Sequence, residues 1–205
     1  ISGALSTSAT AYNGSAGSGS NVGAYPITIG TISAGNNYNI VYTGANVTIN
    51  PVALTITASN QSTVYGTALN LGTSAFTTSG LVNGDVVNAV NLLANGNSLT
   101  LATTPAGNAQ INVSLASGTR LANYNISYVP GTLSVTPKPL TVVANAATMD
   151  YADNALPALT YQPVTGLVNG DVMSGALATQ ATAYNGLAGS ASNAGSYAIT
   201  QGTLT

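Results

Sequence analysis

The chain is built from a tandem repeat, which limits what it can fold into. Residues 3–33 align with residues 175–205 at an offset of 172, with 21 identities over 31 positions. Half of that offset, 86, relates three further pairs of words: GLVNGDVV at 80–87 and GLVNGDVM at 166–173, NYNIVY at 37–42 and NYNISY at 123–128, and LTITASN at 54–60 and LTVVANA at 140–146. The repeat is therefore 86 residues long, and its copies follow one another in tandem.

Proline marks the joints between copies. NPVALTI at 50–56 and TPKPLTV at 136–142 occupy the same phase of the repeat, and proline cannot donate to a central β-ladder. The repeat is longer than a solenoid turn of roughly 20 to 50 residues and has the size of a small domain. We therefore expect an excerpt from a longer array of domains. Its parts are the C-terminal part of one repeat (1–51), a complete repeat (52–137) and the N-terminal part of the next (138–205).

Within the complete repeat the apolar residues alternate or run in short segments bounded by Gly, Asn, Pro or Ser, a pattern typical of strands. Seven strands are predicted, at 53–58, 74–80, 85–93, 97–104, 109–116, 124–129 and 132–137. Pro130 and Gly131 predict a type II turn that joins the last two strands into a hairpin. The fold class expected is all-β, with tandem small Ig-like β-sandwiches. A β-grasp unit with a short helix at 88–96 is the alternative.

The word VNGD, present twice, predicts a tight turn. Gly84 and Gly170 follow an asparagine, and a two-residue turn of the primed type needs the positive φ that glycine adopts at low cost. The simplest interpretation gives the following acid, Asp85 or Asp171, a local capping role. One acid per site is too few for a tight calcium site.

Charge is almost absent from the sequence. Only 3% of residues are charged, whereas about 25% is typical of soluble domains. A formal charge of −2 provides no field that attracts a polyanion, so nucleic acid is excluded as a partner. No apolar stretch of about 18 residues predicts a membrane span. The six charged residues are Asp85, Arg120, Lys138, Asp150, Asp153 and Asp171.

This composition leaves little material for catalysis or metal binding. The chain has no cysteine and no histidine, which excludes disulfides and thiolate metal sites and removes the commonest general base. A Ser–Lys pair or an isopeptide bond would depend on Lys138 alone. Asp85 and Asp171 are one position in two copies, and Asp150 and Asp153 lie in a polar loop. We therefore expect no enzyme, no cofactor, no metal ligand and no catalytic residue.

Tyrosine is the main aromatic residue, and aromatic faces can stack on sugars. Two pairs of tyrosines recur in register and alternate with isoleucine, a spacing that favours packing on one face of a strand over a lectin surface. These pairs are Tyr38 with Tyr42 and Tyr124 with Tyr128. Under the alternative of a glycan-binding module, changing Tyr12 or Tyr184 would abolish binding.

Several words resemble a known family. LTITASNQSTVYGTAL at 54–69, SGLVNGDVV at 79–87 and NYNISYVPGTLSVTPKPLTV at 123–142 resemble MBG repeats of the YGX type, and AYNG is similar to the related YDG repeats. The phase of VYG at 64–66 reads DYA at 150–152, so the third copy lacks this glycine. The resemblance implies a large exported bacterial surface protein, such as a filamentous-haemagglutinin-like adhesin, located outside the cell at its surface.

The function expected is that of a structural stalk segment of an extracellular adhesin or matrix protein. Its partners would be the neighbouring repeats of the same chain. Two alternatives remain open at this point. One is a filament subunit that other copies of the protein complete by strand exchange, and the other is a module for a host or matrix glycan.

Overall fold

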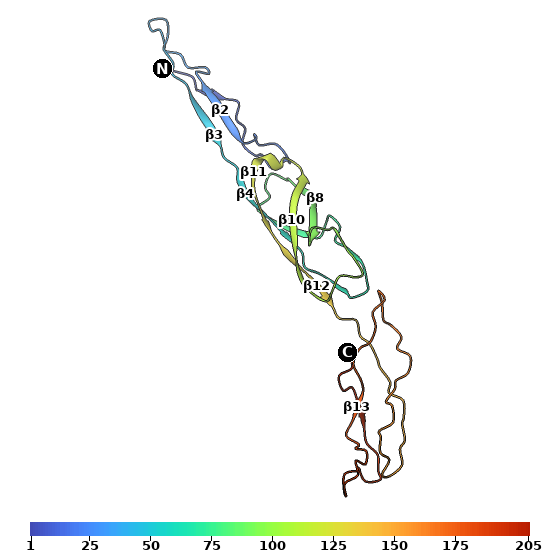
Figure 1. The fold of residues 1–205 in the computed structure, drawn as a ribbon. Helices are drawn as coiled ribbons and strands as arrows, with labels where there is room; N and C mark the ends of the chain where they lie inside the picture. Colours follow the sequence, from blue (N-terminus) through green and yellow to red (C-terminus); the bar gives the residue numbers. More distant parts are fainter. The chain divides into compact units, whose positions relative to one another are not determined.

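The chain folds into strands, turns and irregular segments, with one 3-10 helix and no α-helix (Figure 1). The computed structural model describes all of residues 1–205 and divides them into two units, Ile1–Thr136 and Pro137–Thr205. The predicted all-β class is confirmed. No helix has the length and apolar character needed to cross a bilayer. We name residues 1–51 copy 1, residues 52–137 the complete repeat and residues 138–205 copy 3.

The complete repeat, which lies in the first unit, forms two main sheets. One sheet has the order β5-β12-β10-β8 and the other the order β11-β4-β7, while β6 and β9 form a short separate ribbon. The elements are β4 (Val52–Ala58), β5 (Gln61–Val64), β6 (Leu69–Asn70), β7 (Phe76–Ser79), β8 (Val87–Ala94), β9 (Leu99–Thr100), β10 (Gly107–Gly118), η1 (Leu121–Asn123), β11 (Tyr124–Val129) and β12 (Gly131–Thr136).

The core of this repeat comes from alternate residues of both sheets. Strand β4 buries every second side chain, and β8, β10 and β12 bury theirs in the same period, which is the pattern of a sheet with one face inward. All of the buried cluster lies between positions 54 and 135: Leu54, Ile56, Ala58, Leu71, Val90, Leu92, Ala94, Ile111, Val113, Tyr124, Leu133 and Val135. The repeat therefore has a hydrophobic core of its own.

Two strand pairs are parallel, which distinguishes this repeat from an antiparallel Ig sandwich. Strand β11 pairs with β4, and β12 pairs with β5. The predicted hairpin is therefore wrong, because β11 and β12 belong to different sheets. Pro130 takes the chain from one sheet to the other. Gly131 does not have positive φ; a Cβ there would lie 2.6 Å from Ala58 O, so glycine is needed for close backbone approach rather than for a type II turn.

The segment that the β-grasp alternative needed as a helix is a strand. Residues 88–94 lie within β8, which pairs antiparallel with β10. Asn95 and Gly96 then turn the chain with φ of 50° and 79°. Strand pairing and burial of alternate residues decide the conformation here, as they do for many short apolar segments that are ambiguous in sequence.

Copy 1 forms a sheet of its own, with the same strand order as part of one sheet of the complete repeat. Its strands β1 (Ser6–Thr7), β2 (Gly23–Thr28) and β3 (Ala45–Ile49) form an antiparallel sheet in the order β1-β2-β3. This order corresponds to β8-β10-β12, as the repeat requires. Figure 1 shows β3 running on into β4, and only Asn50 and Pro51 separate the two strands in the sequence. Copy 1 and the complete repeat together make up the first unit.

The second unit contains few regular strands. Its β13 (Ala178–Thr179) and β14 (Ile199–Thr200) pair antiparallel, in the register that β1 and β2 have in copy 1. Its residues correspond to 52–119, and counterparts of β11 and β12 are not among them. Leu140, the counterpart of buried Leu54, lines a hollow of about 480 Å³ together with Val142 and Leu204.

The difference in burial between Leu54 and Leu140 provides a matched test of the core. Leu54 is fully buried, whereas Leu140 is 36% exposed. We expect Leu54→Ala to lower the unfolding free energy of the first unit by about 2 to 5 kcal/mol, because it leaves a cavity in a packed core. Leu140→Ala should cost the second unit much less. Urea denaturation followed by NMR signals of each unit measures both costs, and equal costs would contradict the assignment of the core to 54–135.

Candidate functional site

The VNGD turn has the predicted geometry in both copies. Asn83 and Gly84 have φ of 63° and 69°, and Asp85 N donates to Val82 O at 3.0 Å, which closes a two-residue turn of type I′. In copy 3 the corresponding φ values are 57° and 81°. Positive φ at both central residues explains the Asn-Gly pair, because these two residue types adopt the left-handed conformation most readily.

Asp85 does not cap this turn, contrary to the simplest interpretation of the sequence. Its side chain is buried, and its carboxylate accepts hydrogen bonds from the Tyr124 hydroxyl at 2.8 Å and from Thr119 Oγ1 at 3.4 Å. The Tyr124 hydroxyl also accepts a bond from Val82 N at 3.1 Å. The acid therefore links the turn to the start of β11. A buried bond to a charged acceptor contributes about 1.5 to 3 kcal/mol to stability.

The same region of the complete repeat holds a loop of copy 1, residues 9–22. Figure 1 shows this blue segment beside η1 and the start of β11. Arg120 Nη2 donates to Gly19 O at 2.6 Å and to Asn21 Oδ1 at 3.1 Å. Asn123 contributes two more bonds, from its Nδ2 to Asn21 Oδ1 at 3.0 Å and from Val22 N to its Oδ1 at 2.8 Å. We call this set of bonds, with the one described next, the joint clamp.

The turn itself supplies the remaining part of the joint clamp. Gly17 N donates to Asn83 O at 3.1 Å. A Cβ at Gly84 would lie 2.8 Å from the methyl group of Ala16, so the two backbones approach as closely as glycine allows. Copy 1 thus contacts the complete repeat through the turn, through Arg120 and through Asn123.

Arg120 is held in an unusual backbone conformation. It precedes η1 with φ 52° and ψ 31°, in the left-handed region that non-glycine residues rarely occupy. Its Nη1 and the Oδ1 of Asn83 are buried without a hydrogen-bond partner, which reduces the net stabilisation. Strain of this kind is retained where the surrounding contacts fix a side chain in a required position. Here the strained backbone places the Arg120 side chain against Gly19 and Asn21 of copy 1.

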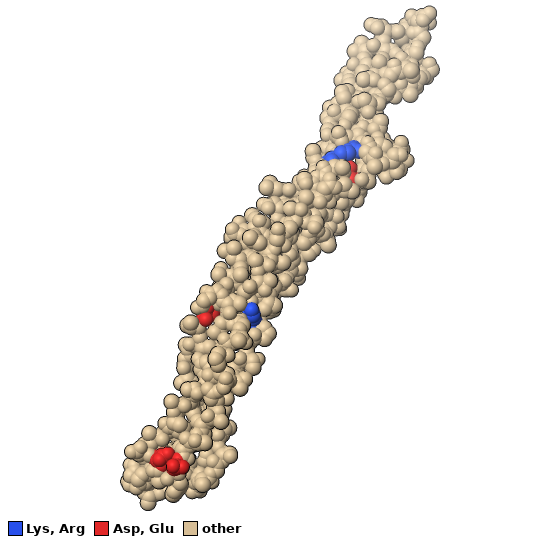
Figure 2. Space-filling view, turned by 90° about the vertical axis from the view of Figure 1, so that its right-hand side faces the viewer, with Lys and Arg blue, Asp and Glu red and all other residues tan.

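The other charged residues lie on the surface, which Figure 2 shows as almost uniformly uncharged. Asp171 is exposed, unlike its counterpart Asp85. Asp153 Oδ2 accepts a bond from Asp150 N at 2.8 Å within a local turn. Lys138 is exposed between two prolines. No group of three or more His, Cys, Asp or Glu side chains converges anywhere in the chain.

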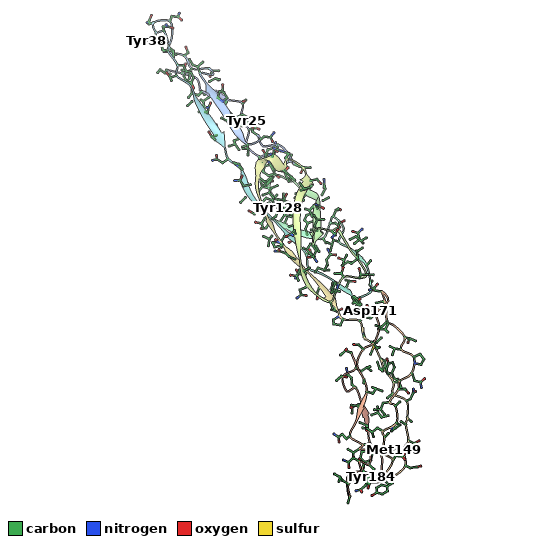
Figure 3. All side chains as sticks on the ribbon, in the orientation of Figure 1. Tyr25, Tyr38, Tyr128, Met149, Asp171 and Tyr184 are labelled. Carbon is green, nitrogen blue, oxygen red and sulfur yellow. The ribbon has the colours of Figure 1, made fainter.

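The tyrosines do not form one surface. Tyr124 is buried as predicted, and Tyr128 OH accepts a bond from Ala116 N at 3.0 Å. Tyr38, however, is 74% exposed in a part of copy 1 that forms no strand, which the predicted packing did not anticipate. Within the first unit, Tyr25, Tyr38 and Tyr128 are well separated (Figure 3). Tyr12 OH bonds to Gly14 O in its own loop.

Sequence reasoning missed the residues that form the joint clamp. It identified the turn but gave no role to Arg120, Asn21 or Asn123. The available signal was the rarity of charge, because a single arginine in a chain with two cations is conspicuous. Its partners had no such signal, since asparagine and glycine are abundant throughout the sequence.

The contact between Gly84 and Ala16 leads to a prediction with an internal control. Backbone strain in Gly84→Val should lower the unfolding free energy of the first unit by about 1 to 3 kcal/mol. The clash with Ala16, which must move, adds a further loss to this amount. Gly170→Val carries only the strain, since no atom lies within 4 Å of a Cβ there. Asn83→Ala should cost less than Gly84→Val, because no new group meets copy 1. Denaturant unfolding of the three variants measures these costs, and equal costs for Gly84→Val and Asn83→Ala would rule out the close approach.

The buried tyrosine leads to a pH dependence. Burial, and then the bond to Asp85, raises the pKa of Tyr124 above its ordinary value, although the Val82 backbone bond partly opposes this shift. A raised folded-state pKa stabilises the fold fully below the unfolded pKa of about 10, and this stabilisation is lost as the pH rises through the folded pKa. We expect the first unit to lose stability above about pH 10. Tyr124→Phe should reduce the slope of stability against pH, and an unchanged slope would contradict the role of Tyr124.

Comparison with known families assigns the chain to one of them. Residues 54–134 and 140–205 match the MBG domain (YGX type), and together they cover well over half of the sequence. No curated protein and no solved structure matches the chain. The two matched segments lie within the complete repeat and copy 3, and they begin 86 residues apart. The chain is therefore a member of the MBG domain family of the YGX type.

Proposed function

We propose that this chain is a structural segment, a stalk, of a bacterial extracellular adhesin or matrix protein, and that it has no catalytic role. The joint clamp is the observation that carries the proposal. A polypeptide that serves only to separate other domains needs repeats that fold individually and joints that limit bending. The complete repeat has its own core, and copy 1 is fixed to it by bonds from Arg120, Asn123 and Asn83.

The surface chemistry supports the same function. Six charged residues in 205 provide almost no long-range attraction or repulsion between copies, so neighbouring repeats interact through short-range contacts that salt screens little. The most buried carboxylate, that of Asp85, is bound to Tyr124 and Thr119. An acid held in this way stabilises the structure and is not available to a substrate. This favours the stalk over an enzyme.

A glycan-binding role has less support. A sugar platform needs aromatic faces gathered on one surface, whereas Tyr25, Tyr38 and Tyr128 lie well apart along the first unit (Figure 3). We therefore place the protein outside the cell on the strength of its family resemblance and expect its neighbouring repeats to be its main partners.

Small-angle X-ray scattering tests the stalk. A compact domain of 205 residues has a radius of gyration of about 17 Å. Repeats joined in series and held by the joint clamp should give a clearly larger value that does not change with protein concentration. A value near that of a compact domain would rule out the stalk. An apparent mass that grows with concentration would instead favour a self-assembling filament subunit.

A further inference from the structure

The loop of copy 1 that enters the joint clamp has a twin in copy 3. Residues 9–22 read ATAYNGSAGSGSNV, and residues 181–194 read ATAYNGLAGSASNA. We call them the copy-1 loop and the copy-3 loop. The stretch of the complete repeat in the same phase is 95–108. It shares only Ala102 with the copy-1 loop and only Leu101 and Ala102 with the copy-3 loop. The loop is therefore a feature of two copies and is not required by the fold of the repeat.

The two loops share most of their internal hydrogen bonds; the bond from Tyr12 OH to Gly14 O occurs in the copy-1 loop alone. Thr10 N donates to Ser20 Oγ at 2.8 Å, and in the copy-3 loop Thr182 N donates to Ser192 Oγ at 2.8 Å. Three further bonds recur in the same way: Asn13 N to Ser18 Oγ and Asn185 N to Ser190 Oγ, Ser15 N to Asn13 Oδ1 and Leu187 N to Asn185 Oδ1, and Tyr25 OH to Asn21 O and Tyr197 OH to Asn193 O. The copy-3 loop is thus folded like the copy-1 loop.

The two loops have different partners outside themselves. In the copy-3 loop, Tyr184 N donates to Asp153 O at 2.7 Å, whereas the side that enters the joint clamp in copy 1 has no partner in copy 3. In the copy-1 loop, the Asn21 side-chain oxygen accepts bonds from Arg120 and Asn123. Its counterpart, the side chain of Asn193, makes no hydrogen bond within the chain. Gly17 and Gly189 share φ of 74°, but a Cβ would meet Arg120 Nη1 at 3.0 Å at Gly17 and nothing within 4 Å at Gly189.

Internal folding explains Gly189, whose φ of 74° favours glycine, but it does not explain why Asn193 is present. The local bonds account for the threonine, the serines and the first asparagine of each loop. The side chain of Asn21 bonds only across the joint, so the same residue type at position 193 has a use only if a similar surface meets it. Arg120 has no counterpart in copy 1, where its phase is Ala34. The loop and the arginine thus occur in different copies, and one joint needs both of them.

We propose that the copy-3 loop is a docking surface for an MBG repeat of the same kind as residues 52–137. This repeat would present an Asn-Gly turn, an arginine and an asparagine in the phases of Asn83–Gly84, Arg120 and Asn123. This inference rests on the proposed structural function, and it names the kind of repeat that binds the copy-3 loop. Two kinds of repeat then alternate along the chain with a period of 172 residues, twice the basic unit.

One substitution in the copy-3 loop bears on the fit. Gly19 is replaced by Ala191, and a Cβ at Gly19 would lie 3.0 Å from the Nδ2 of Asn83. That atom is the end of a side chain, which can move by a few tenths of an ångström. The carbonyl group that accepts the arginine bond belongs to the backbone and is present in either residue. The partner surface therefore fits with a small movement of one asparagine.

NMR titration tests the docking surface. The full chain, labelled with 15N, is titrated with the unlabelled repeat 52–137, whose core lies wholly within 54–135. The joint clamp is far smaller than a standard interface, so we expect a dissociation constant on the order of 1 mM. The amide signals of Gly189 and Ala194 should shift and gain protection from hydrogen exchange. Those of Gly17 and Val22 should stay unchanged, because their partners are already present in the same chain.

Two variants show whether the shifts come from the proposed bonds. Asn193→Ala in the labelled chain and Arg120→Ala in the added repeat should each weaken binding by about tenfold or more, because each removes bonds to a charged donor. The dispersion of the NMR spectrum shows whether the altered repeat is folded. If it is not, Arg120→Lys replaces it and should also weaken binding, because lysine keeps the charge but loses the forked geometry.

Three outcomes would overturn the docking surface. These are no shift at about 5 mM of added repeat, equal shifts at Gly17 and Gly189, or unchanged binding by the Asn193→Ala chain. None of them affects the scattering test of the stalk, which depends on how the repeats are joined within one chain. A compact particle in scattering, in turn, would refute the stalk while leaving this titration interpretable.

Discussion

The hydroxyl of Tyr124 is the point at which the core of the repeat and its joint depend on each other. It is buried between Val82 and Asp85, and so it fixes the VNGD turn against the first residue of β11. Asn123 directly precedes this tyrosine in the chain and Arg120 lies four residues before it, so the bond that anchors β11 also places the side chains that hold copy 1. A near-neutral sequence achieves this with one carboxylate, because a buried charge with good donors has a strong effect where water cannot replace them.

Much of this architecture could be predicted from the sequence. The 86-residue period, seven of the nine strands of the complete repeat and the positive φ of Gly84 and Gly170 follow from repeats, alternation and turn chemistry, which are local signals. The two strands that were missed are β5 and β6. The pairing of strands is not local. Pro130 and Gly131 have the composition of a hairpin turn, yet the chain changes sheets there because β4 and β5 supply parallel partners for the strands on either side. Nothing within residues 124–136 encodes that choice.

The candidate site was predicted only in part, for a similar reason. Asp85 and the turn around it are visible in the sequence, but the partners of Asp85 are Tyr124 and Thr119, which lie more than thirty residues away. The contacts of Arg120 with Asn21 cross about a hundred residues and involve residue types that are common throughout the chain. The burial of Tyr124 and the exposure of Tyr38 differ although both occupy the same word. The reason is that only Tyr124 has β4 beside it.

The parallel pairing of β11 with β4 and of β12 with β5 has a consequence for tension along the polypeptide. The chain reaches the complete repeat at Val52, the start of β4, and leaves it at Thr136, the end of β12, and Figure 1 shows these points at opposite ends of the repeat. A pull on the two ends therefore acts along β4 and β12 and tends to slide them past their neighbours. In that direction the hydrogen bonds of a strand pair are loaded together, whereas peeling a hairpin open loads them one after another. The arrangement thus shares an external force among many weak bonds.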